Sequence, residues 1–541
     1  MDMETLDIEV RKYIRNIELQ KAEAQRCIAE LTERQKAVAA ENNLLHIQLT
    51  ELKERYDLLL YKRFARSAEQ LLKDKKQLFL FDEPISNEEE PGTGQTAPQT
   101  IKSYKRSARG RKPIDPAIPR EVEIIDIPEA DKRCACGTML KKIGEEISER
   151  LEIVPPRIYV KQIVRPKYAC PECEGADDPD KPTVHVAPAP VSIIPGSIVT
   201  PGLLSTIMIA KYQDHLPFYR QELQFERIGV TISRQDMAHW QQRVYQRLLP
   251  LFELLKQAVK SGPVMGMDET TVQVMGEEGR ADTQKSYMWL ARGGPPGKPV
   301  VLFEYRETRA AKHLPEFLEG FVGYLQTDGY RGYETAISSY PAIRHVGCFA
   351  HARRYFFEAA KVTRTSGSQK KGLAEEAIGY IKKLYVLEET LRKQDISLSR
   401  FLNERGKAAA VIFSEFKAWL DQKVQETPPS LLLGKAIGYT RDHWETLTAY
   451  TECAYLTPDN NACENALRPF VLGRKNWLFN KSPDGAKSSC GMYSLIETAK
   501  QNGLIPRDYL TLLFDRCPSA KTPEDWAALL PWNIKNNKKN T

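Results

Sequence analysis

A seven-residue repeat near the N-terminus constrains the fold more than any other feature of this chain. Every seventh position of one series is apolar: Ile17, Ala24, Leu31, Val38, Leu45, Leu52 and Leu59. The partner series is mixed and includes the polar residues Lys21, Gln35 and Asn42. Such a pattern predicts a coiled coil over residues 10–76, and Asn42 between leucines favours a parallel dimer. The alternative interpretation is a long helix that packs on its own protein.

The length of 541 residues is too great for one hydrophobic core, so several domains are expected. No apolar run approaches the roughly 18 residues that span a bilayer. The N-terminal sequence also lacks the basic-then-apolar order of a secretory signal. We therefore expect a cytoplasmic protein without a membrane partner, whose ten cysteines are free thiols or metal ligands rather than disulfides.

Residues 77–112 are predicted to form a linker that is first acidic and rich in proline and glycine, then basic. The net charge of +7 is a weak argument for nucleic-acid binding, so the position of the charge matters more. The basic part contains Lys102, Lys105, Arg106, Arg109, Arg111 and Lys112 and no acid. This run can follow DNA phosphates and enter a narrow minor groove, and a solvated linker is the equal alternative.

Two close cysteine pairs within residues 113–190 predict a zinc site. They are Cys134 with Cys136 and Cys170 with Cys173. Four thiolates suit tetrahedral zinc, although the first pair is tighter than the usual knuckle spacing. The residues between the pairs alternate as short strands do. A small zinc-ribbon-like β domain follows, with unrelated thiols as the alternative.

Residues 191–260 have helical periodicity. We expect a helix from Pro201, a second that ends at Gly229, and one further helix over residues 234–259 that Thr231 or Ser233 caps. This order resembles a helix-turn-helix, which is a DNA-binding arrangement. A helical bundle without DNA contacts remains the alternative.

The pattern changes to strands over residues 261–350. Residues 263–274, 285–292 and 298–306 predict three antiparallel strands, and a helix and two further strands follow. This is the order of a ribonuclease-H-like core. Because the first and fourth strands of that fold are neighbours, Asp268 and Asp328 are expected to point to one place.

A third acid, Glu464, lies on a predicted helix within residues 451–495. Thr457 can cap this helix, Pro458 suits its first position and Pro469 is expected to end it. Three carboxylates from two strands and a helix can hold two divalent metal ions for phosphoryl transfer. An ion pair of Glu464 with Arg468 on a helix surface is the structural alternative.

These segments together resemble the transposases of the insertion-sequence 66 family, of the DDE class. The resemblance rests on MDETTVQV, TDGYRGYE, GCFAHARRYFFEA, PDNNACENALRPFVLGRKNWLF and the closing NGLIPRDYL with KTPEDWAALLPW, and it covers nearly the whole chain. It implies that Asp268, Asp328 and Glu464 bind two Mg²⁺ or Mn²⁺ ions. Asn465 departs from the basic residue of many relatives, which affects a DNA contact and not the triad.

The resemblance also implies the reaction and its partners. The enzyme would cleave transposon ends at their terminal inverted repeats and transfer the strands into target DNA. The resemblance further implies accessory transposition proteins as partners and a location at the bacterial nucleoid. Two rival hypotheses remain: a ribonuclease-H-like nuclease or resolvase without strand transfer, and a non-catalytic zinc and helix-turn-helix regulator.

A helical insertion is expected over residues 351–450, and a helical element over residues 496–541. Cys348 and His351 precede the insertion, but two candidate ligands favour packing over metal binding. Arg353 and Arg354 follow and are candidates for phosphate contact.

Beyond Glu464, a predicted DNA-binding strand alternates basic and aromatic residues: Arg468, Arg474, Lys475, Trp477, Phe479, Lys481 and Lys487. Burial of the two aromatic residues in the core is the alternative. The chain is thus predicted to be a multidomain protein of α+β and α/β class. It combines a coiled coil, a zinc-ribbon-like domain, a helix-turn-helix-like region and a ribonuclease-H-like core with a helical insertion.

Overall fold

The computed structural model describes residues 8–64, 122, 124, 158–169, 184–365 and 372–537. The chain divides into two compact units, one formed by Ile85–Ala189 and the other by Met1–Pro84 with Pro190–Thr541. Some predicted site residues lie outside the described residues: Lys105, Arg106, Arg109, Arg111, Lys112, Cys134, Cys136, Cys170 and Cys173.

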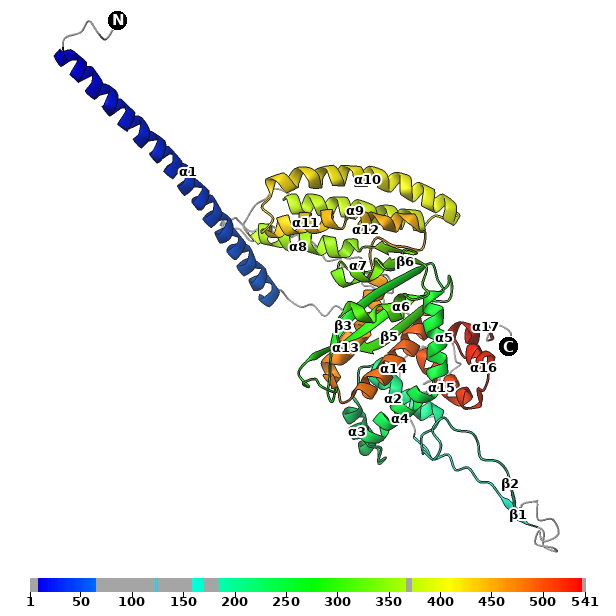
Figure 1. Ribbon diagram of the computed structural model, residues 1–541. Coiled ribbons are helices and arrows are strands. Elements are labelled where there is room, and N and C mark those ends of the chain that lie inside the picture. The colour runs from blue at the N-terminus through cyan, green and yellow to red at the C-terminus, as the bar shows by residue number, and fades with distance from the viewer. Residues whose placement is uncertain are drawn as a thin grey trace, which may run out of the picture. The chain divides into compact units, whose positions relative to one another are not determined.

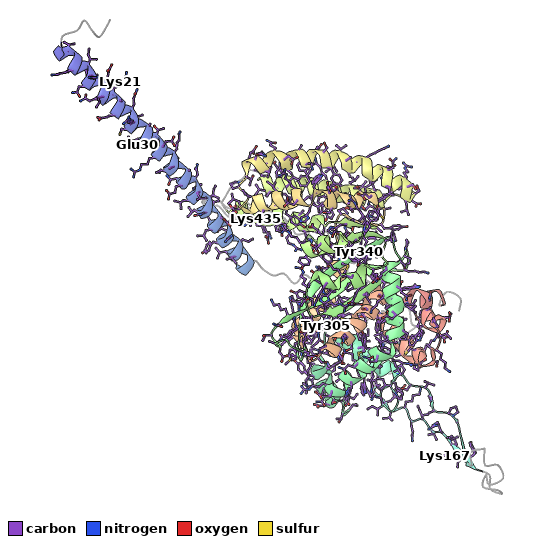
Figure 2. All side chains as sticks on the ribbon, viewed as in Figure 1. Lys21, Glu30, Lys167, Tyr305, Tyr340 and Lys435 are labelled. Carbon is purple, nitrogen blue, oxygen red and sulfur yellow. The ribbon has the colours of Figure 1, made fainter. Side chains whose placement is uncertain are left out.

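The heptad segment forms a single helix, α1 (Ile8–Phe64), of 57 residues. Its apolar heptad residues are exposed, with 60% of Leu31 and 66% of Leu52 accessible. Figure 2 shows Lys21 and Glu30 among the side chains along this helix. The helix itself is confirmed, while its pairing with a second copy stays a prediction. Among the described residues, no helix combines the length and apolarity needed to cross a membrane.

In the smaller unit, the described strands β1 (Lys167–Ala169) and β2 (Val184–Val186) form an antiparallel hairpin. Tyr168 lies opposite His185 in this pair. Figure 2 labels Lys167 at the start of β1. Of the alternating segment between the cysteine pairs, residues 158–169 are described, and only β1 is a strand, whereas residues 158–166 are not. The predicted short strands are therefore confirmed only in part.

Four helices precede the main sheet: α2 (Pro201–Tyr212), α3 (Phe218–Arg227), α4 (Arg234–Arg247) and α5 (Leu249–Lys260). Ser233, and not Thr231, caps α4 by accepting a hydrogen bond from the Asp236 amide. The single helix predicted over residues 234–259 is wrong, because the chain breaks at Leu248. Pro250 lacks the amide hydrogen that a continuous helix requires. It lies instead in the first turn of α5, where that hydrogen bond is not needed.

The main sheet has six strands: β3 (Val264–Val274), β4 (Lys285–Gly293), β5 (Val300–Arg306), β6 (Gly323–Gln326), β7 (Ile343–Val346) and β8 (Phe479–Asn480). Their order is β5-β4-β3-β6-β7, and β8 pairs with the far end of β3. The first three strands are antiparallel, and β6 and β7 run parallel to β3. The predicted strands and their antiparallel start are confirmed.

The register between β3 and β6 places the two aspartates at one level. Gly266 of β3 pairs with Gln326 of β6. Asp268 and Asp328 each lie two residues beyond this pair, toward the same end of the two parallel strands. The expectation that the first and fourth strands are neighbours is therefore confirmed.

Helix α14 (Pro483–Gln501) covers the edge strand β5. The amides of Val301 and Phe303 donate hydrogen bonds to the hydroxyls of Thr498 and Ser494, at 3.0 and 2.8 Å. An edge strand with unpaired amides can pair with other chains, so these hydroxyls protect it. The C-terminal helices α15 (Pro506–Arg516), α16 (Pro523–Ala528) and α17 (Pro531–Asn537) follow. Figure 1 shows α14 beside β5.

Helices α8–α12 form a layer with its own apolar core between β7 and the Glu464 helix in the chain order. They are α8 (Phe349–Thr365), α9 (Leu373–Arg392), α10 (Leu398–Glu426), α11 (Leu432–Asp442) and α12 (Trp444–Thr448). Figure 1 shows α9, α10 and α11 side by side, as their contacts require. Aromatic residues fill this core, with the rings of Phe416 and Trp444 5.7 Å apart.

Candidate active site

The helix that carries Glu464 is α13 (Asn461–Trp477), and its bounds differ from the prediction. It begins after Asn460 rather than Thr457, and it continues through Pro469. A proline inside a helix costs about 3 kcal/mol. Burial of the helix face that includes Leu467 and Phe470 offsets this cost. Glu464 consequently lies in the first turn of the helix, where the positive end of the dipole favours a carboxylate.

Gly266 allows α13 to approach β3 closely. A Cβ atom at this position would lie 2.7 Å from the Cys463 sulfur and 2.8 Å from the Asn460 side-chain oxygen. The Asn460 amide group also donates to the carbonyl oxygen of Met267 at 2.9 Å. These contacts hold the first turn of α13 against the strand that carries Asp268.

Asp268 is the most perturbed acid of this site. Burial, followed by the negative charges of Glu269, Glu464 and Asp328, raises its pKa to about 8. It accepts one hydrogen bond from the Glu269 amide at 2.8 Å, which acts in the opposite direction. The negative charges of Glu464 and Asp328 therefore act on Asp268. A divalent cation such as Mg²⁺ or Mn²⁺ bound at Asp268 would relieve this repulsion.

Asp328 is oriented by groups on both of its carboxylate oxygens. Oδ1 accepts a hydrogen bond from the Tyr330 amide at 3.1 Å, and Oδ2 lies 3.4 Å from an Arg309 guanidinium nitrogen. The same guanidinium lies 3.9 Å from the centre of the Tyr330 ring. These contacts hold Asp328 beside the end of β6.

Glu269 is a buried acid that the sequence analysis missed. Its side chain is 2% exposed and accepts hydrogen bonds from Arg309 and from the hydroxyl of Tyr333 on α7 (Arg331–Ile337). Burial raises the pKa of Glu269 in spite of these donors. The sequence shows Glu269 directly after Asp268. It does not show that Arg309 and Tyr333 bind Glu269, because no periodicity links their segments to this strand.

Cys348 and His351 at the start of α8 lie beside Glu464. The His351 Nδ1 atom is 3.9 Å from the Glu464 Oε1 atom. Burial lowers the pKa of His351, so the neutral imidazole is favoured. Cys348 and His351, the two candidate ligands in the sequence, thus have Glu464 beside them as a third.

Arg353 lies mostly inside the protein. It is 6% exposed, and its guanidinium lies 5.4 Å from the Phe357 ring. This burial argues against the predicted contact of Arg353 with DNA, which stays a prediction. The adjacent Arg354 is exposed.

The predicted DNA-binding strand after Glu464 is wrong over most of its length, because it forms the rest of α13. Arg468 and Lys475 are exposed on this helix. Arg474 is half-buried and donates hydrogen bonds to the hydroxyls of Thr270 and Thr271, at 3.2 and 3.0 Å. Arg474 thus ties α13 to β3, and a contact of these three cations with DNA stays a prediction.

The two aromatic residues of this segment differ in their burial. Trp477 is half-buried, and its ring lies 5.5 Å from that of Phe470. Phe479 on β8 is 43% exposed. Burial of both in the core, the alternative interpretation, holds only in part.

Four family models match the chain. The largest, described as "Transposase IS66 family", matches residues 196–488, which contain all three acids. A model described as "zinc-finger binding domain of transposase IS66" matches residues 131–174 and spans the four clustered cysteines, which supports structural zinc. "IS66 C-terminal element" matches residues 494–532, and "Transposase C of IS166 homeodomain" matches residues 51–122.

Two similar proteins come from Sinorhizobium fredii (strain NBRC 101917 / NGR234), and both are described as uncharacterized. Protein y4jD is 32% identical over 448 residues, which cover 81% of this chain and 84% of the relative. Protein y4qI is 33% identical over 442 residues, which cover 80% of this chain and 78% of the relative. The likeness thus extends over most of both chains.

Proposed function

The chain belongs to the IS66 family of transposases, and from this premise we propose that it cleaves transposon ends and joins them to target DNA. One observation carries the proposal. Asp268 is half-buried, and its burial together with the negative charges of Glu269, Glu464 and Asp328 raises its pKa. A carboxylate in such surroundings is a candidate ligand for the divalent ions that metal-dependent phosphoryl transfer requires.

The strand order supports a ribonuclease-H-like core of the DDE class. Three antiparallel strands followed by two parallel strands bring Asp268, within β3, to the level of Asp328, just beyond the end of β6. The effect of the Glu464 charge on Asp268 supports Glu464 of α13 as the third ligand. A nuclease without strand transfer shares this geometry, but the family favours the transposase.

The proposed mechanism assigns a role to each acid. Asp268, Asp328 and Glu464 would hold two Mg²⁺ or Mn²⁺ ions, which supply an activated water for cleavage and an activated 3′-hydroxyl for joining. Arg309 orients Asp328 through its guanidinium. Arg468 and Lys475, which are exposed on the same helix as Glu464, would bind DNA phosphates.

The remaining modules would bind and pair DNA ends. We assign structural zinc to Cys134, Cys136, Cys170 and Cys173, and phosphate contacts to the basic residues Lys105, Arg106, Arg109, Arg111 and Lys112. A dimer through α1 would bring two transposon ends together, since its heptad face is exposed. Accessory transposition proteins are further partners in this proposal.

The test is cleavage of labelled transposon-end DNA by the full chain in Mg²⁺. Asp268→Asn removes a direct metal ligand, so cleavage and joining should fall below about one hundredth of the wild-type rate, because even outer partners of a metal are worth 10–100-fold. Specific end binding, measured by gel shift, should remain. The matched control is Asp515→Asn, which changes an exposed carboxylate on α15.

Cleavage by the Asp268→Asn variant at the wild-type rate would reject the assignment. A precleaved end distinguishes the two enzymes, because a transposase joins it to target DNA and a resolvase leaves it unjoined. Binding without any metal-dependent cleavage by the wild-type chain would favour the regulator.

A further inference from the structure

Three metal-ligating side chains meet where α8 and α13 begin. Cys348 precedes α8, and His351 and Glu464 lie in the first turns of α8 and α13. Two backbone groups hold the helix starts together. The Phe349 amide donates to the Pro458 carbonyl oxygen at 2.9 Å, and the Asn460 amide donates to the Cys348 sulfur at 3.3 Å.

The ligand atoms of Cys348, His351 and Glu464 all lie within 4.8 Å of one another. The His351 Nδ1 and Glu464 Oε1 atoms are 3.9 Å apart, which is too long for a hydrogen bond. Both atoms are buried, and neither has a hydrogen-bond partner in the described part of the chain. Leaving such groups unsatisfied costs about 1–3 kcal/mol each.

A cation between the two atoms would satisfy both. Ligand atoms at about 2.0–2.3 Å from one ion are separated by roughly 3 to 4 Å from each other. The separation of 3.9 Å between nitrogen and oxygen falls in this range. The set contains sulfur and nitrogen besides one carboxylate, and such ligands favour zinc-like ions over magnesium.

We propose that Cys348, His351 and Glu464 form a binding site for one borderline-soft divalent cation of the zinc class, with a fourth position open to water. The site does not include the four clustered cysteines or the oxygen ligands Asp268 and Asp328, and it shares Glu464 with the proposed triad. It does not depend on the proposed reaction, since a protein without transposase activity could hold the same ion.

The charges around the site agree with a cation. Burial raises the pKa of the Cys348 thiol to about 12, so the free thiol is protonated. On binding, the sulfur–hydrogen bond breaks, the proton leaves to solvent and the sulfur bonds to the metal as a thiolate. Asp459 and Asp328 add negative charge nearby, and Arg354 adds the opposing positive charge.

The shared ligand links this site to the proposed triad. A carboxylate has two oxygens, so Glu464 can bind an ion through Oε1 and keep the second oxygen for another partner. The ion would then fix the Glu464 carboxylate beside Asp268. Cys348 and His351 would be positioning residues for the triad through this ion.

The experiment uses Co²⁺ as the probe on the full chain and compares wild type with Cys348→Ser. The four clustered cysteines are intact in both proteins, so their cobalt contribution cancels in the difference spectrum. We expect wild type to bind one more Co²⁺ per chain and to show an additional thiolate-to-cobalt band in the near ultraviolet. Cys463→Ser is the matched control, since this buried thiol on α13 belongs to no such cluster among the described residues.

Equal cobalt stoichiometry and no difference band would overturn the proposal. His351→Gln tests it without touching a thiol and should weaken the additional site at least tenfold, so unchanged affinity would also overturn it. Circular dichroism checks that each variant is folded. Asp268→Asn should retain the additional cobalt, which separates a failure of this site from a failure of the proposed function.

Discussion

The two faces of β3 give two neighbouring acids different surroundings. Asp268 and Glu269 are consecutive residues of one strand, so their side chains point to opposite faces. Burial raises the pKa of both. Glu269 accepts hydrogen bonds from Arg309 and Tyr333, whereas Asp268 faces the further negative charges of Glu464 and Asp328.

The difference indicates which acid needs a partner from outside the protein. The chain supplies Glu269 with a cation and a hydroxyl, so this carboxylate stabilises the fold and holds Arg309 in place. Within the described part of the chain, Asp268 is surrounded by the negative charges of Glu269, Glu464 and Asp328 and accepts a hydrogen bond from the Glu269 amide. A buried acid in such a setting is a candidate metal ligand.

The largest expected effect on stability comes from Gly266→Ala, which disturbs the Asp268 face. The added methyl group would contact Cys463 and Asn460 and push α13 away from β3. We expect the free energy of unfolding to fall by about 3 kcal/mol, measured by urea unfolding. Cleavage should fall as well, because Glu464 moves with the helix.

The control for this change is Gly379→Ala on α9, where an added Cβ meets nothing within 4 Å. It should raise stability by about 0.5–1 kcal/mol, because alanine favours a helix over glycine. Wild-type stability and activity in Gly266→Ala would show that α13 can bind β3 at a greater distance.

The second prediction compares Glu269→Gln with Asp268→Asn in the absence of added divalent cations. Glu269→Gln weakens two charge-assisted hydrogen bonds, so the free energy of unfolding should fall by about 2 kcal/mol. Asp268→Asn removes a carboxyl group whose ionisation is disfavoured in the folded protein, so the free energy of unfolding should stay unchanged or rise. Urea unfolding followed by tryptophan fluorescence measures both. Equal losses in the two variants would remove the distinction between the faces.

The smallest expected effect comes from Tyr333→Phe, which removes one donor to Glu269. Tyr333 is fully buried, so its ring should keep its packing while the hydroxyl is lost. We expect a loss of about 1 kcal/mol in unfolding free energy. In the Glu269→Gln background the loss should be smaller, and full additivity would contradict a shared interaction.

The meeting of the predicted acids could be inferred from the sequence because strand order constrains distance. A meander followed by a parallel strand makes β3 and β6 neighbours, and this brings Asp268 and Asp328 to one level. Strand order does not predict the position of Arg309, because this residue lies in a loop whose path depends on tertiary contacts. Local patterns therefore predicted the acids and missed the groups that orient them.

Two helix boundaries show where local rules fail. Pro250 divides the segment predicted as one helix, whereas Pro469 does not end α13. The sequence rule is the same in both places. The outcome at Pro469 depends on the burial of Leu467 and Phe470 against the rest of the protein, which a local pattern does not contain.

The hydrogen bond between the Phe349 amide and the Pro458 carbonyl oxygen closes the helical layer at its base. The chain leaves the sheet and returns to it on the two sides of this hydrogen bond. A change in the number of residues between these two points would leave Asp328 and Glu464 where they are, provided that the hydrogen bond is kept. The length of the segment between Asp328 and Glu464 is consequently a poor measure of the site, and relatives should be aligned on these two points rather than on the spacing.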